Sequence, residues 1–325
     1  MMKKSALNSC CKTFIVLLVL LLSACSPPPQ KPLRLASSPW PGYEPLYLGR
    51  DLDIMDNDTI RLYELPSSDI TMESFRNKST DLATLTLDET LELLHDGVKL
   101  KILLVLDISH GGDAALAPAS IPDLSAIKGK RIAIVNIPLG LYMLNRMLDK
   151  AGLHRNDVEV FPMSESKQFK FYQQGKADVV VTFEPVKSRL LDAGLHVIFD
   201  STQIPNEIFD LLVVHEDVYQ ARRDDICRLV KDWYKTLNYI HDNKADAAQR
   251  ITRRLRVATD EFDHVMGGII LPDAFRNRQL LGGDTPGILQ ASARLSDIMV
   301  REGQLSKAVS LTGSLDKSFA NCHIE

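Results

Sequence analysis

The sequence predicts an α/β fold in which mostly parallel sheets are divided between two lobes. Strand-like segments alternate with amphipathic helical segments along residues 33–215, and this alternation is typical of parallel strands joined by helices. About 300 residues remain once the apolar N-terminus is set aside, which is more than one small core usually holds. No second long apolar run follows, so the sequence predicts no transmembrane domain.

Residues 1–24 have the pattern of a secretory signal peptide. The basic start "MMKK" precedes the apolar run Phe14–Leu22, which is too short to span a bilayer as a helix. The following "LLSAC" resembles a bacterial lipobox. That resemblance implies cleavage before Cys25 and lipidation of its thiol and its new amino group. The alternative is an ordinary signal peptide with a chance cysteine.

A lipidated Cys25 predicts a protein of the cell envelope that is anchored to the inner or the outer membrane. Several acyl chains, each contributing about 0.8 kcal/mol per buried methylene, would hold it stably. Residues 25–32 contain "SPPPQKP", and we expect this stretch to be a stiff tether between membrane and fold.

The mature chain is acidic. Removing residues 1–24 takes away three lysines and no acids, so that 35 basic residues face 42 acidic ones and the net charge becomes −7. This balance disfavours nucleic acid as a partner. Two further cysteines remain, Cys227 and Cys322, and they could equally form a disulfide or be two buried thiols.

Apolar and β-branched runs predict the strands in chain order. The run at 100–109 is almost continuously apolar, as expected for a strand covered on both faces. The predicted strands are 33–37, 60–65, 81–87, 100–109, 128–138, 158–163, 177–185, 196–201 and 208–215.

Helical periodicity fills the intervals between these strands, and the chain becomes helical throughout after Glu216. In the long segment 222–255 the apolar stripe includes Trp233, which we expect in the helix core. The predicted helices are 44–53, 67–79, 88–97, 139–153, 166–176, 186–195, 222–255 and 291–305.

Six separated segments together resemble the nitrate, sulfonate and taurine type of periplasmic solute-binding protein of ABC importers, a group that includes binders of thiamine-pyrimidine precursors. They occur in the family's order between about residues 33 and 300. The segments are "WPGYEPLYLGR", "DLATLTLDETLELLHDGVKLKILLVLDISHGGDAALA", "IKGKRIAIVNIPLGLYMLNRMLDKAGL", "VEVFPM", "GKADVVVTFEP" and "DSTQIPNEIFDLLVVHEDV".

The resemblance implies a type II periplasmic binding protein with two crossover strands and a ligand cleft between the lobes. It implies that residues 33–110 form the first part of lobe 1, 111–212 form lobe 2, and 213–325 complete lobe 1. The chain would leave lobe 1 near Ser109–Gly112 and return near Leu211–His215. Such lobes close about a hinge around a ligand.

An aromatic turn follows the first strand in "SSPWPGY". Ligands of open α/β sheets lie beyond the carboxyl ends of the strands, so we expect Trp40 and Tyr43 to line the cleft. A flat aromatic pair suits stacking on a planar or cationic ligand. The alternative for Trp40 is that it plugs the end of the sheet.

Polar residues at other predicted strand ends are further ligand candidates: Thr86, Asp88, Ser109, Asp113 and Glu184. Asp88 has a second interpretation as a helix N-cap. Asp107 is expected to be part of the hinge. Glu184 matches a family site position, which makes it the strongest candidate of the five.

The turn after "KGKRIAI" is where anion-binding relatives hold a sulfonate-like group on hydroxyls and free amides. Here it reads "NIPLG", which keeps Asn136 and Gly140 as candidates, while Pro138 removes one amide donor. This departure argues against sulfonate and nitrate. Aromatic and carboxylate side chains favour a planar amine, a pyrimidine-like base or another cation.

We therefore expect a solute-binding lipoprotein that passes a small planar or cationic nitrogen compound to an ABC permease. We expect no cofactor, no metal and no catalytic residue, because the histidines are scattered and no Cys-x-x-Cys, His-Glu-x-x-His or Gly-x-Ser-x-Gly motif occurs. The alternative is a ligand-sensing partner of a membrane sensor kinase or cyclase, which the sequence does not separate from the first hypothesis.

Lipidation gives the first testable prediction. Replacing the acylated residue (Cys25→Ser) removes the anchor, so the protein should move from the membrane fraction to the soluble envelope fraction. Metabolic labelling with palmitate should mark the wild type only. A variant that stays on the membrane, together with an unlabelled wild type, would contradict the lipobox.

Overall fold

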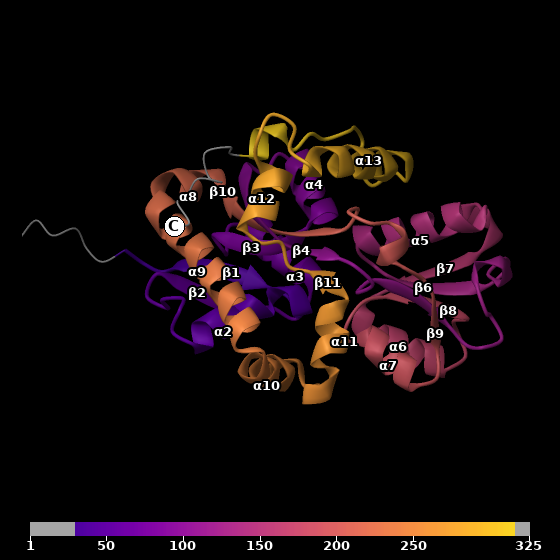
Figure 1. Cartoon of the computed structure of the whole chain (residues 1–325). Helices are drawn as coiled ribbons and strands as arrows, with labels where there is room; N and C mark the ends of the chain where they lie inside the picture. The colour runs from indigo at the N-terminus through magenta and orange to yellow at the C-terminus, as the bar shows by residue number, and fades with distance from the viewer. Residues whose placement is uncertain (1–29, 316–325) are drawn as a thin grey trace, which may run out of the picture. The chain divides into compact units, whose positions relative to one another are not determined.

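A computed structural model of the chain describes residues 30–315, and its strands belong to two mixed sheets (Figure 1). Within this range six strands form the first sheet, in the order β11-β4-β10-β3-β1-β2. β1 is parallel to β2 and β3, whereas β10 is antiparallel to β3 and β4. These strands are β1 (Leu33–Ser37), β2 (Ile60–Glu64), β3 (Leu82–Thr86), β4 (Leu100–Ser109), β10 (Phe209–His215) and β11 (Ile269–Ile270).

The second sheet has five strands in the described part of the chain, in the order β7-β6-β8-β5-β9. β6 is parallel to β7 and β8, and β5 is antiparallel to β8 and β9. The strands are β5 (Ala114–Ala117), β6 (Arg131–Val135), β7 (Glu159–Met163), β8 (Val179–Thr182) and β9 (His196–Asp200). We call each sheet with its covering helices a lobe, the six-stranded one being the first.

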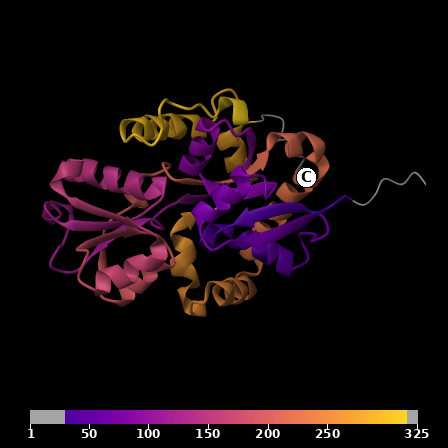
Figure 2. The same ribbon diagram turned by 180° about the vertical axis from the view of Figure 1, so that it is seen from behind.

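Helices cover both sheets, as Figure 2 shows from behind. The second lobe has α5 (Pro138–Ala151), α6 (Glu165–Gln173) and α7 (Val186–Asp192). The remaining α-helices are α2 (Glu44–Asp51), α3 (Ser68–Arg76), α4 (Leu87–His95), α8 (Glu216–Ala221), α9 (Arg223–Asp242), α10 (Lys244–Leu255), α11 (Phe262–Gly267), α12 (Ala274–Leu281) and α13 (Ile288–Arg301). Short 3₁₀ turns are η1 (Pro41–Tyr43), η2 (Leu124–Ala126), η3 (Arg155–Asp157), η4 (Ser201–Gln203), η5 (Thr259–Glu261) and η6 (Thr312–Ser314).

Local sequence explains where several helices begin and end. Thr86 and Glu89 form a reciprocal capping box at the start of α4, which satisfies backbone amides that the helix itself cannot. α5 ends at Gly152, whose φ of 66° lies in the left-handed region that glycine tolerates. In α9 the side chain of Trp233 is fully buried, as its place in the apolar stripe predicts. Cys227 in the same helix is disulfide-bonded; Cys322, which the sequence left open as its partner, lies outside the described residues.

The chain passes between the lobes in two places within residues 30–315. It leaves β4 after Ser109 and enters β5 at Ala114, and it returns between β9 and β10. The two passages are joined by a hydrogen bond of 2.7 Å between the hydroxyls of Ser109 and Ser201. The amide of Gly111 also donates to the Ser201 hydroxyl at 2.6 Å.

The return lies earlier in the chain than the sequence indicates. Residues 211–215 are inside β10, which pairs with β3 and β4 of the first sheet, so the second passage ends before Phe209. The expected boundary at residue 212 is therefore several residues late. The apolar run at 208–215 does not show where the crossover ends, because a crossover segment and a buried strand can both be apolar.

The C-terminal helices contact both lobes, whereas the sequence assigned them to the first alone. α12 packs on β4, and α13 packs on α4 of the first lobe and on α5 of the second (Figures 1 and 2). Near the first passage, the carbonyl of Gly268 accepts hydrogen bonds of 2.8 Å from the amides of His110 and Gly112.

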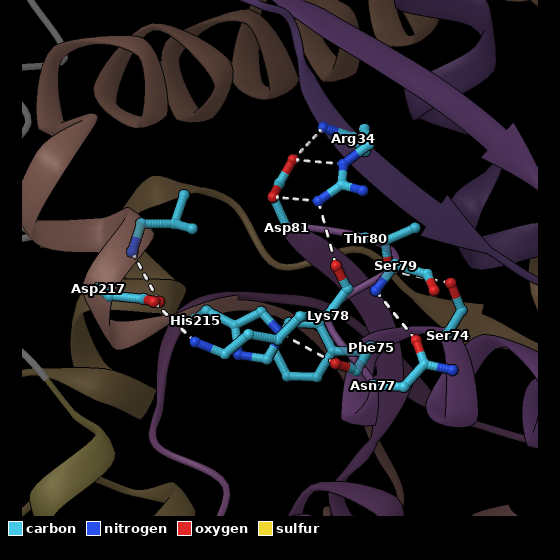
Figure 3. Close-up of polar contacts among 11 residues, drawn as sticks. Arg34, Ser74, Phe75, Asn77, Lys78, Ser79, Thr80, Asp81, His215 and Asp217 are labelled. Carbon is cyan, nitrogen blue, oxygen red and sulfur yellow. Dashed lines mark hydrogen bonds and ion pairs between the residues drawn. The ribbon is translucent and has the colours of Figure 1, made fainter.

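The edge of the first sheet at which β1 and β3 begin is held by polar contacts (Figure 3). The guanidinium of Arg34 donates two hydrogen bonds to Asp81, of 3.0 and 2.8 Å. The ring of His215, at the end of β10, stacks on Phe75 with ring centroids 3.9 Å apart. Its Nε2 lies 2.9 Å from the Phe75 carbonyl oxygen, and burial lowers its pKa. This network holds together the strands at their starts. The loops described below lie at the opposite, carboxyl ends of β1 and β3.

Asn277 pairs with a part of β4 that has no neighbouring strand on that side, and this contact gives the second prediction. β11 pairs with β4 only at Ile108 and Ser109. At Val105 the Asn277 side chain takes the place of a strand, accepting from the amide at 2.8 Å and donating to the carbonyl at 3.0 Å. Asn277→Ala leaves both buried groups unpaired and should lower the free energy of unfolding by roughly 1–3 kcal/mol.

Urea denaturation would measure this loss. Arg276→Ala, one residue away on the exposed face of α12, is the matched control and should change stability by about 0.5 kcal/mol or less. Equal stability of the two variants would show that Asn277 does not support the strand.

Candidate functional site

A small pocket with a free volume of about 40 Å³ lies where the two lobes meet, at the carboxyl ends of β1 and β3. This is the edge at which ligands of open α/β sheets bind. The free volume is well below the several hundred Å³ that is typical of ligand pockets. Both lobes contribute to its wall. The lining residues are Ser38, Pro39, Trp40, Tyr43, Ser68, Thr86, Asp113, Ile137, Leu139, Phe183 and Asp210.

Three aromatic side chains form one wall, and two of them are fixed by carboxylates. The indole nitrogen of Trp40 donates to Asp107 at 3.0 Å, and the Tyr43 hydroxyl donates to Asp210. Phe183 from the second lobe meets the Trp40 ring edge-on, with centroids 5.9 Å apart. Both sequence-predicted aromatics therefore line the pocket in fixed orientations.

Gly42 is required by this arrangement. A Cβ atom there would lie 1.7 Å from a carboxylate oxygen of Asp107 and 2.7 Å from the indole nitrogen of Trp40. Since these atoms form the hydrogen bond that orients the tryptophan, any side chain at position 42 would displace it.

Asp107 and Asp210 are opposite each other on β4 and β10. Both are buried, and burial raises the pKa of each carboxyl, that of Asp107 to about 7 and that of Asp210 further because the charge of Asp107 adds to the effect. Two such carboxyls cannot both ionise at low cost, so the pair keeps a proton to a higher pH than an isolated carboxyl does. Asp107, which the sequence predicts to be part of the hinge, orients Trp40 in the aromatic wall. Its Oδ1 has no hydrogen-bond partner in the structure.

Asp113 lines the pocket at the first passage between the lobes. Burial, reinforced by the charges of Asp88 and Glu184, raises the pKa of its carboxyl to about 7, and Lys187 partly counteracts this. The carboxylate faces the pocket at the boundary between the lobes, which is the position expected from the sequence.

The two carboxylate oxygens of Glu184 differ in their contacts. Oε2 accepts from the amide and hydroxyl of Ser188 at 3.1 and 2.8 Å, as a helix cap does. Oε1 has no hydrogen-bond partner, although the ammonium of Lys187 lies 3.5 Å away. Glu184 borders a wider hollow next to the pocket rather than the pocket itself.

Buried carboxyl groups greatly outnumber buried cationic groups at this site. Among residues 30–315 Lys187 is the only lysine or arginine with a buried side chain, and it donates at 2.9 Å to the Gly111 carbonyl. Against it stand six carboxyl groups, none more than 4% exposed. These are Asp88, Glu89, Asp107, Asp113, Glu184 and Asp210.

Thr86, Asp88 and Glu89 come from the start of α4. Thr86 lines the pocket and caps the helix, and its amide donates to Glu89 at 2.9 Å. Burial raises the pKa of Asp88 to about 6. Burial and the charge of Asp88 together raise the pKa of Glu89 to about 8. One oxygen of each carboxylate lacks a hydrogen-bond partner.

Three residues that the sequence predicts as ligand contacts do not line the pocket and instead make structural contacts. Asn136 is exposed, and its amide pairs with the Met163 carbonyl. A Cβ atom at Gly140 would lie 2.1 Å from the Val135 carbonyl oxygen, so glycine allows α5 to pack closely on β6. Ser109 holds the two passages together. Ile137 and Leu139 from the same turn as Asn136 do line the pocket.

Sequence reasoning missed Asp210, Phe183, Lys187 and Glu89 as members of the site. Asp210 had a usable signal, because it is the one charged residue in the apolar run "IFDLLVV". A carboxylate inside a buried strand is costly and so is rarely incidental. The others carry no local signal and come together only through the tertiary fold.

Among the described residues no group of three or more His, Cys, Asp or Glu has the geometry to hold a metal ion. The helices between residues 30 and 315 are all too short or too polar to cross a bilayer.

Comparison with known proteins supports the fold. A family model described as "NMT1/THI5 like" matches residues 60–247. No curated protein matches the sequence at a significant level.

Solved structures cover nearly the whole fold at low identity. The periplasmic aliphatic sulphonate binding protein SsuA from Escherichia coli is 14% identical, covering 88% of this chain and 92% of its own, with a TM-score of 0.75. The alkanesulfonate-binding SsuA from Xanthomonas axonopodis pv. citri, bound to MOPS, is 15% identical, covering 88% and 98%, with a TM-score of 0.70. The desulfurization enzyme DszB is 16% identical, covering 89% and 98%, with a TM-score of 0.66. The predicted two-lobed periplasmic-binding-protein fold is thereby confirmed.

The raised pKa of Asp113 gives the third prediction. A carboxyl whose pKa is higher in the folded state holds its proton there while the unfolded chain has lost it. Between about pH 4 and pH 7 the unfolded state therefore binds fewer protons, and stability falls as pH rises. Asp113→Asn should remove up to about 1.4 kcal/mol per pH unit from this slope.

Urea denaturation of the ligand-free protein at pH 5, 6, 7 and 8 would measure the slope. Asp123→Asn is the control, since hydrogen bonds from Ser125 lower the pKa of this exposed carboxyl and its titration lies below the window. Identical slopes for Asp113→Asn and the wild type would contradict the assignment.

Proposed function

Because the chain belongs to the NMT1/THI5-like family, we propose that it is a solute-binding protein that delivers a small molecule to an ABC permease. The two-lobed fold with a pocket between the lobes supports this function. So do the similar folds of two SsuA proteins, which are binding proteins for sulfonates. The proposal includes a lipid anchor at Cys25 on the outer side of the cytoplasmic membrane or on the outer membrane; this residue lies outside the described range.

The ligand that we propose is a small planar or cationic nitrogen compound. The observation that carries this is the excess of buried carboxyls around an aromatic pocket whose lining includes Asp113 and Asp210. Buried charges are expensive unless they are paired. A ligand bearing N–H donors or a positive charge would pair with the Asp113 carboxylate, and the faces of Trp40 and Tyr43 would hold its plane.

The same charges argue against a sulfonate here. An anion entering the pocket would meet the ionised carboxylate of Asp113 in a site of low dielectric, and like-charge contact of this kind disfavours a wrong ligand by several kcal/mol. The SsuA proteins thus support the class of function, while the side chains of this chain support a different ligand.

We propose binding rather than catalysis. The fold alone does not decide, since DszB is described as an enzyme. The aromatic rings are held by internal hydrogen bonds to Asp107 and Asp210, and a surface fixed in advance binds its ligand with a smaller loss of entropy.

The fourth prediction tests the ligand class on residues 26–325, which lack the acylated cysteine. Thermal-shift screening covers organic ammonium and amidinium compounds, pyrimidines, sulfonates and nitrate. The melting temperature should rise only with an ammonium, amidinium or pyrimidine compound. Asp113→Asn should lower the affinity for that compound about tenfold or more, since it removes a charge-assisted hydrogen bond.

Calorimetry at two pH values separates a cationic ligand from a neutral one. Because Asp113 has a pKa of about 7, the site must lose protons to hold a cation, and the affinity should fall from pH 8 to pH 6. A neutral pyrimidine should show little change. A shift with taurine or nitrate alone, retained in Asp113→Asn, would refute the ligand class, and no shift with any compound would refute binding.

A further inference from the structure

A second hollow lies beside the pocket, and Trp40 lines both. Its free volume is about 540 Å³, against about 40 Å³ in the pocket. The pocket therefore has room for a few water-sized groups only, whereas the hollow has room for the body of a solute. Both lobes border the hollow, with Glu184 and Pro185 from the second lobe and Val265 from α11. Both views show α11 beside the second lobe (Figures 1 and 2).

Arginine side chains at the end of α10 form another wall of the hollow. Arg253, Arg254 and Arg256 all line it. The guanidinium of Arg254 is engaged, because it donates to Glu44 at 2.8 Å and to Glu64 at 2.7 Å. With the ammonium beside Glu184 included, four cationic groups stand against three carboxyl groups at the hollow. This balance is the reverse of the one in the pocket.

Arg253 and Arg256 keep their donors free. Among residues 30–315, the hydrogen bonds and ion pairs of the three arginines all belong to Arg254. The charge of Arg253 also acts on Asp246, which is already paired with Arg250. Both free side chains are exposed. Each offers five N–H donors in a planar fork that matches a carboxylate or a phosphate.

Arg256 keeps its side chain at a cost in backbone strain. Its φ of 60° lies in the left-handed region, where the end of a helix usually has glycine. The helix dipole favours cations in the last turn, which accounts for Arg253 but does not require an arginine where glycine fits the backbone better. A role for the Arg256 guanidinium in binding explains why the strain is retained.

We propose that the ligand site extends past Trp40 into the hollow, where Arg253 and Arg256 bind a carboxylate or phosphate group of the same solute. The inference rests on the proposed solute-binding function and narrows its ligand class to planar nitrogen compounds that carry an anionic substituent. The nitrogen end would lie at Asp113 and the anionic end at the arginines, with Trp40 between them. The pocket can therefore repel a simple anion while the hollow attracts an oxyanion, since different charged groups act on the two ends.

Calorimetry on residues 26–325 with matched compounds tests the proposal. Benzamidine is a planar cation, and 4-amidinobenzoate and 4-amidinophenylphosphonate add a carboxylate or a phosphonate at the far end of the ring. The wild type should bind one of the two derivatives about tenfold or more tightly than benzamidine. The ranking of the two derivatives distinguishes a carboxylate site from a phosphate site.

The double variant Arg253→Gln with Arg256→Gly should lose this preference. It should still fold, because glycine suits the backbone at position 256. Arg301→Gln is the matched control and should keep the preference, since this exposed arginine belongs to α13, which lies away from α10 in Figure 1.

Equal affinities of the wild type for benzamidine and both derivatives, or a preference that the double variant retains, would overturn the proposal. Inorganic phosphate keeps the hollow testable if no amidine binds, because it needs no planar group. The wild type should bind phosphate, and the double variant should bind it about tenfold more weakly. Phosphate binding that is absent or unchanged also overturns the proposal. Failure of the proposed function is distinct, since the wild type would then bind phosphate but no nitrogen compound.

Discussion

Buried carboxyl groups that outnumber buried cations at the junction of the two lobes are the constraint on which the rest of the site depends. Unpaired buried charge is so costly that the structure reduces it in several ways. Burial raises the pKa of Asp107 and Asp210, which favours their neutral forms, and both carboxyls accept hydrogen bonds from the aromatic side chains. The orientation of the aromatic wall is therefore a consequence of where the carboxyls lie. Asp113 and Asp210 remain in the lining of the pocket between the lobes.

The sequence was informative where local pattern determines structure. Alternation of strand and helix predicted the two-sheet fold, and the turn "SSPWPGY" placed Trp40 and Tyr43 at a strand end, where the structure has both lining the pocket. Asp113 followed from the same rule about strand ends. Each of these inferences needs only the chain direction and the geometry of a sheet.

It was uninformative where strands distant in the chain come together. Asp210 is 103 residues from Asp107 in the sequence, and only the antiparallel insertion of β10 between β3 and β4 makes them neighbours. The turn at Asn136 and Gly140 misled for a related reason. Their residue types suit an anion site, but the glycine is needed for close packing of α5 on β6.

The position of α13 bears on how such a cleft could open. This helix packs on α4 in one lobe and on α5 in the other, and apolar residues of both lobes, including Leu91, Met143 and Leu295, belong to one continuous core. Bending the two passages alone would not separate the lobes, because α5 would have to slide along α13 as they part. Opening is then a shear of packed helices as well as a rotation, and close packing limits shear to small steps. Access for a solute would come from many small side-chain readjustments along α13 rather than from one wide swing.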